Sequence, residues 1–125
     1  MDNDKPVYQS EYEKFIQAYV SGTTTAEAVG VMVMHMAQYY SQYNVLYATR
    51  LNTFNQTARS FEEKRDESTG KSISSTKAKS LADATEESCA LNYAKVHVAN
   101  IEQMLNALKA LQRGIMVEWN QGNNI

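Results

Sequence analysis

The residues of this 125-residue chain that could carry out chemistry do not form a complete catalytic or metal-binding pattern. Thr69-Gly70-Lys71-Ser72 matches the end of a phosphate-binding loop, but the full pattern needs a glycine where Arg65 stands, and a preceding strand. His35 and His97 each lack a second ligand-type residue three or four positions further on, the spacing of a metal pair on a helix. Cys89 has no adjacent histidine to activate it as a nucleophile. We therefore predict a protein that is not an enzyme and that uses no metal ion or cofactor.

The charge balance limits the choice of partners. The chain has 12 Lys and Arg residues against 14 Asp and Glu residues, a formal net charge of −2, which excludes a strongly basic grip on nucleic acid. Lysines at and after the turn nevertheless leave a local positive excess: Lys71, Lys77 and Lys79. Electrostatic affinity grows with the number of phosphates neutralised, so an oligomer would be needed to multiply these few contacts. A nucleic-acid accessory module for recombination or replication is therefore an alternative to the main prediction below.

Glycine, proline and serine divide the chain into three predicted helices within one domain over residues 1–125. Pro6 suits the first turn of a helix over residues 6–21, and Gly22 is suited to end it. Thr24 or Thr25 can cap the second helix, predicted over residues 25–67. This helix is expected to be uninterrupted, because no glycine or proline occurs from position 31 to position 69. A polar loop follows, and a third helix is predicted over residues 75–120.

Heptad spacing predicts that the two long helices form an antiparallel hairpin. On the third helix, apolar residues alternate spacings of three and four, and the second helix carries a matching stripe. When the chain is folded about the Gly70 turn, facing residues have numbers that add up to about 142, as in Leu51 with Leu91 and Ala37 with Leu105. The predicted fold class is all-α: a long antiparallel, coiled-coil-like helical hairpin with the short N-terminal helix packed at its base.

A second apolar stripe on the helix over residues 25–67 is not used by this seam. Its members are Met32, Met36, Tyr39, Tyr43 and Leu46. The N-terminal helix can cover only part of the stripe, and leaving apolar area in water forfeits about 25 cal/mol per Å². We therefore predict a homo-oligomer, or a complex with another protein, formed through these residues.

The sequence predicts a cytoplasmic location, in a bacterial or host cell, or a place in a virion. The longest apolar run, from Ala28 to Ala37, is shorter than the roughly 20 residues that a membrane-spanning helix needs. The first residues are polar and lack the basic start and apolar core of a signal peptide. No membrane partner is expected.

Three short segments carry a resemblance to a known class of protein. They are Tyr47-Ala48-Thr49-Arg50, Thr69-Gly70-Lys71-Ser72 and the heptad stretch over residues 94–118. Over roughly residues 40–118 the chain resembles small helical proteins encoded by bacteriophages and prophages. The resemblance implies a phage origin and supplies no catalytic residues. It adds a third functional alternative, a phage-encoded inhibitor that docks on a host protein.

Overall fold

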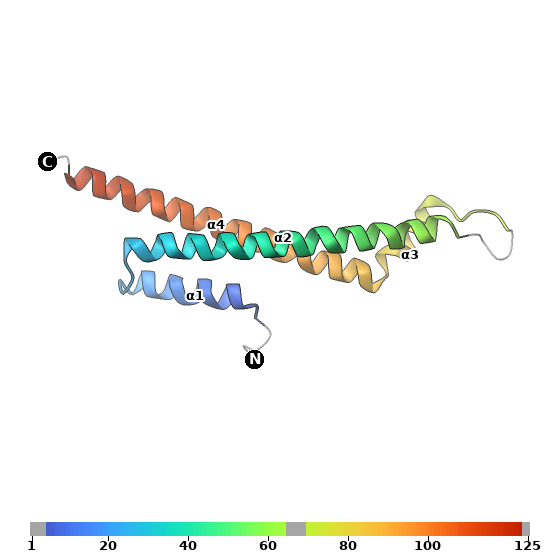
Figure 1. Ribbon diagram of the computed structural model, residues 1–125, viewed down its shortest axis with the longest axis horizontal. Helices are drawn as coiled ribbons and strands as arrows, with labels where there is room; N and C mark the ends of the chain where they lie inside the picture. Colours follow the sequence, from blue (N-terminus) through green and yellow to red (C-terminus); the bar gives the residue numbers. More distant parts are fainter. Residues whose placement is uncertain (1–4, 65–69, 124–125) are drawn as a thin grey trace. The chain divides into compact units, whose positions relative to one another are not determined.

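The computed structural model describes residues 5–64 and 70–123. Figure 1 shows the elements of this part of the chain: α1 (Val7–Val20), α2 (Ala26–Glu62), α3 (Ser75–Asp83) and α4 (Glu86–Asn123). No strand occurs among the described residues. The prediction of an all-α fold built on a helical hairpin is confirmed, with α2 and α4 as its two long helices.

The chain divides into two compact units. Unit 1 comprises Met1–Ser41 and Ala99–Ile125, and unit 2 comprises Gln42–Val98. Unit 1 holds α1 with the first part of α2 and most of α4, whereas unit 2 holds the rest of α2, α3 and the start of α4. The single domain expected over residues 1–125 stays a prediction.

One contact within each unit shows that α2 and α4 are antiparallel. In unit 2, Arg50 Nη1 donates a hydrogen bond to the carbonyl oxygen of Ala90 over 3.0 Å. In unit 1, a Cβ placed on Gly30 would lie 3.6 Å from Gln112 Nε2. The residue numbers of the two pairs add up to 140 and 142, close to the constant value that the heptad pattern predicts.

The helix ends follow from local capping chemistry. Gly22, at a φ of +76°, adopts the left-handed backbone conformation just after the end of α1, which glycine does at little steric cost. At the start of α2 the Thr25 hydroxyl accepts a hydrogen bond from the Ala28 backbone N–H over 3.2 Å. At the start of α3 the Ser74 hydroxyl accepts one from the Lys77 N–H over 3.1 Å.

The helix expected over residues 75–120 is interrupted at Ala84 and Thr85, which separate α3 from α4. Thr85 is the physical reason. Its hydroxyl donates to the Ala82 carbonyl oxygen over 2.7 Å, which closes α3, and accepts from the Ser88 N–H over 3.2 Å, which caps α4. The helix expected over residues 25–67 ends at Glu62, and residues 65–67 of that prediction lie outside the described chain.

Unit 1 has a core of large apolar side chains supplied by three helices. These residues are buried: Tyr8 from α1, Val29, Met32 and Met36 from α2, and Ile101, Leu105 and Leu108 from α4. The Tyr8 and Tyr39 rings lie 6.1 Å apart, and the Tyr39 hydroxyl donates to a Glu11 carboxylate oxygen over 3.0 Å. The predicted packing of the short N-terminal helix at the base of the hairpin is thus confirmed within this unit.

The core of unit 2 consists of small side chains, and part of the predicted seam is wrong there. On α3, Ala78 and Ala82 are buried, whereas Leu81 and Ala84, which the constant sum of 142 assigns to the seam, are exposed. The interruption at Thr85 shifts the helical phase of α3 relative to α4, so a seam drawn through one continuous helix selects the wrong face. Among the described helices, none is long and apolar enough to cross a bilayer.

Candidate interaction surfaces

The structure divides the predicted self-association stripe into a buried and a half-buried part. Met32 and Met36 lie in the core of unit 1, and Met36 has no exposed surface at all. Tyr39, Tyr43 and Leu46 are half-buried. The expectation that the two methionines are open to a partner is therefore wrong for the chain as folded, because the core of unit 1 encloses them. Self-association itself stays a prediction.

The face of α2 that points away from this core is exposed and uncharged. Val31 and Met34 are 51% and 63% exposed, and Gln38 and Ser41 are also exposed. These four residues, all in unit 1, follow spacings of three, four and three, and we call them the outer stripe. Between Ala28 and Thr49, about six helical turns, the sequence contains no Asp, Glu, Lys or Arg. The lack of charged residues can be read from the sequence, whereas a search for apolar residues alone does not reveal it.

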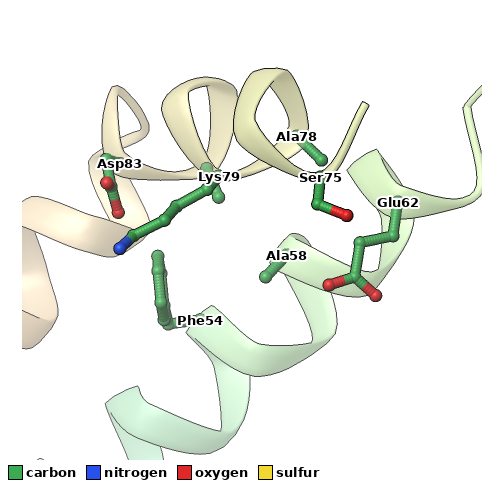
Figure 2. Close-up of a pocket in the computed structure, with 8 residues that line it drawn as sticks. Phe54, Ala58, Glu62, Ser75, Ala78, Lys79 and Asp83 are labelled. Carbon is green, nitrogen blue, oxygen red and sulfur yellow. The ribbon is translucent and has the colours of Figure 1, made fainter. Parts of the chain in front are cut away.

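A pocket of about 300 Å³ lies between α2 and α3 within unit 2, as Figure 2 shows. Its walls are apolar and its rim is charged: Phe54, Ala58, Ala78 and Ala82, with Glu62, Ser75, Lys79 and Asp83. Lys79 and Asp83 lie at one side of the pocket in Figure 2, and Glu62 lies at the other with Ser75. The pocket therefore combines a small apolar cavity with charges of both signs.

Of the lysines predicted to contact nucleic acid, Lys79 lines this pocket, whereas Lys71 and Lys77 do not. Lys71, Lys77 and Lys79 are all exposed. Lys79 shares the pocket rim with the carboxylates of Glu62 and Asp83. Opposite charges nearby reduce the positive potential that a phosphate would meet. The surroundings of Lys79 therefore give no particular support to the nucleic-acid alternative, which remains a prediction.

Unit 2 also contains a run of rings and a cation that spans α2 and α4. The His97 ring lies between two tyrosines, with its centroid 5.4 Å from that of Tyr43 and 4.3 Å from that of Tyr93. The Arg50 guanidinium lies over the Tyr93 ring, 5.4 Å from its centroid. The Tyr93–His97 pair is edge-to-face, the Tyr43–His97 pair is tilted, and Arg50 makes a cation–π contact with Tyr93. The run holds Arg50 in a fixed position, because its Nη1 also binds the Ala90 carbonyl oxygen.

Burial controls the charge of this run. It lowers the pKa of His97 below the ordinary value of 6.5, so the ring is mostly neutral at pH 7. Burial also raises the pKa of the Tyr43 hydroxyl above 10.0; the Tyr93 phenol adds to this effect and the Arg50 guanidinium opposes it. Near neutral pH, Arg50 is therefore the group in this run that carries a full charge.

A shallow hollow opens beside these groups, with a volume of about 460 Å³. Its lining residues are Gln42, Tyr43, Leu46, Arg50 and Tyr93. Of these residues, Tyr43 and Leu46 were predicted from the sequence, as members of the self-association stripe. Tyr93 was not predicted, and the constant sum of 142 places His97 opposite Val45 rather than near Tyr43. Within the described part of the chain, no three His, Cys, Asp or Glu residues gather as metal ligands would.

Comparisons of the chain with known protein families, with curated proteins and with solved structures give no match.

Proposed function

We propose that this chain is a non-enzymatic helical interaction protein that self-associates through the outer stripe of α2. The observation that carries the proposal is the exposure of Val31 and Met34 on a helix whose sequence is free of charge from Ala28 to Thr49. A helix face that stays in water normally carries charged residues, whereas the centre of a protein interface is depleted of Lys, Asp and Glu and enriched in Met.

The spacing of the outer stripe supports a second helix as the occupant. Val31, Met34, Gln38 and Ser41 stand at the positions that a coiled-coil seam uses, and a polar residue such as Gln38 within a seam fixes its register. A second copy of the chain offers the same stripe, so in a dimer with two-fold symmetry the outer stripe of each copy packs against that of the other. Covering Val31 and Met34 removes apolar area from water at about 25 cal/mol per Å².

Light scattering after size exclusion tests the proposal with a charge placed in the stripe. The wild type is expected to show a concentration-dependent mass above 14.1 kDa. Met34→Lys is expected to return the mass to that of one chain, because an ammonium group is costly to bury in an interface. Val96→Lys is the matched control, since Val96 is 55% exposed on α4 in unit 2. Lysine is well tolerated in helices, and circular dichroism verifies the fold of both variants.

Disulfide trapping gives an independent readout of the same contact. The natural thiol, Cys89, is exposed and is first replaced by serine. In that background, Met34→Cys is expected to form a covalent dimer under mild oxidation, because a seam position brings the two Cβ atoms within disulfide range. Val96→Cys is expected to stay monomeric. A wild type of single-chain mass at every attainable concentration, or equal trapping at both positions, would contradict the proposal.

A further inference from the structure

The shallow hollow beside Arg50 has the size and lining of a site for a small ligand. Its volume of about 460 Å³ lies within the range of small-molecule sites. Leu46 supplies apolar surface, Tyr43 and Tyr93 supply ring surfaces, and Gln42 supplies an amide. All of these residues belong to unit 2, so the site is formed within one compact unit.

The electrostatics of the hollow favour an anion. Of the five lining residues, Arg50 carries a positive charge and none is an acid. The guanidinium has five N–H donors, and the bond to the Ala90 carbonyl oxygen uses one of the two on Nη1. The position of the guanidinium over the Tyr93 ring holds its N–H donors in a defined orientation before a ligand binds. The pocket between α2 and α3 differs, because there Lys79 shares the rim with two carboxylates.

The tyrosines of the hollow are arranged to receive a planar ring. Tyr93 is 50% exposed to solvent, and the His97 ring packs against it in an edge-to-face arrangement at a centroid distance of 4.3 Å. Tyr43 contacts the same histidine from α2, at 5.4 Å. Aromatic rings held in this way lose little conformational freedom when another ring packs on them.

We propose that this hollow binds a small ligand made of a planar ring and one acidic group, either a carboxylate or a phosphate. The ring packs against Tyr43 and Tyr93, and the acidic group accepts hydrogen bonds from the Arg50 guanidinium. A nucleoside monophosphate and an aromatic carboxylate both have this chemistry, and the experiment below distinguishes them.

The two histidines make the test internally controlled. Proton NMR of the full chain follows the ring C2–H signals of His97 and of His35, which is exposed in unit 1; the variant His35→Gln assigns them. The probes are adenosine monophosphate and indole-3-acetate, each with a neutral counterpart, adenosine and indole-3-acetamide. The expected result is a saturable shift of the His97 signal with an acidic probe and an unmoved His35 signal. The probe that gains more affinity over its own neutral counterpart identifies the preferred acidic group.

Two variants separate the charge from the ring. Arg50→Gln is expected to weaken the acidic probe about tenfold and to abolish its advantage over the neutral counterpart, as expected for one lost charged hydrogen-bond partner. Arg59→Gln is the matched control, because Arg59 is an exposed arginine on the same helix and does not line the hollow. Tyr93→Leu is expected to weaken acidic and neutral probes alike. Circular dichroism confirms that each variant is folded.

Several results would overturn the inference. They are an unmoved His97 signal with all four probes, equal affinity for acidic and neutral probes, equal shifts of both histidines, and unchanged affinity in Arg50→Gln.

Discussion

Replacing Met36 by alanine tests the packing of unit 1, because Met34 provides a matched control on the same helix. The Met36 side chain has no exposed surface, whereas that of Met34 is 63% exposed. Truncating a buried methionine removes its transfer free energy and leaves a cavity, which together cost about 2–5 kcal/mol. The same truncation at an exposed site changes stability by no more than about 0.5 kcal/mol. The small difference in helix propensity between methionine and alanine is common to both variants.

Urea unfolding followed by circular dichroism measures the difference in unfolding free energy between the two variants. It is carried out at the lowest practical protein concentration, so that self-association contributes little to the measured stability. Met36→Ala is expected to lower the midpoint strongly with an unchanged slope, and Met34→Ala is expected to leave it nearly in place. Similar midpoints for the two variants would refute the burial of Met36 in the core of unit 1. A large loss only in Met34→Ala would mean that α2 is rotated about its axis.

Three further tests address the electrostatics of unit 2 and the backbone at two glycines. His97 is expected to titrate below 6.5 in the folded chain, because burial disfavours its charged form; its contribution to stability is present above pH 6.5 and is lost as the pH falls through the folded pKa. An NMR titration that places this pKa above 6.5 would contradict the burial. Gly114→Ala is expected to stabilise α4 by about 0.5–1 kcal/mol, whereas Gly22→Ala, at a φ of +76°, is expected to cost about 1–2 kcal/mol. Thermal unfolding measures both changes, and a shared sign would contradict this account of the two backbones.

The seam on α4 was predictable because its period is a direct consequence of helix geometry. Ala94, Ile101, Leu105 and Leu108 recur at spacings of seven, four and three, and all are buried. Such a stripe can face only one way on a helix, so its burial follows from the sequence once the helix is identified. The pairing of α2 with α4 followed from the turn at Gly70 by the same geometric argument.

The interruption at Thr85 was not predicted, because a short capping motif competes there with strong helix formers. Alanine and leucine around it favour a continuous helix, and no glycine or proline marks a stop. What ends α3 is the pair of hydrogen bonds made by one hydroxyl, to Ala82 and from Ser88. Thr85 followed by Glu86 and Glu87 is typical of a helix start, but the same residues also fit a helix interior.

The choice of buried face on α2 could not be made from its apolar residues, because the helix carries more than one apolar stripe. Met32 and Met34 differ little in sequence context, yet the first is buried in the core of unit 1 and the second is exposed. The heptad stripe through Ala37 had been assigned to the seam, and Ala37 is exposed. Helix α1 accounts for part of this difference, because its packing on α2 depends on tertiary contacts such as Tyr39 with Glu11.

The self-association proposed for the outer stripe and the ligand binding proposed for the hollow can be tested separately. The outer stripe of Val31 and Met34 lies in unit 1, and the hollow around Arg50 lies in unit 2. If the two proposals are independent, Met34→Lys changes the mass of the particle and leaves the response of His97 to acidic probes intact, whereas Arg50→Gln does the reverse. A ligand response that disappears together with the oligomer would instead mean that the second copy helps to form the hollow. The pair of variants therefore decides whether the hollow belongs to one chain or to the assembly.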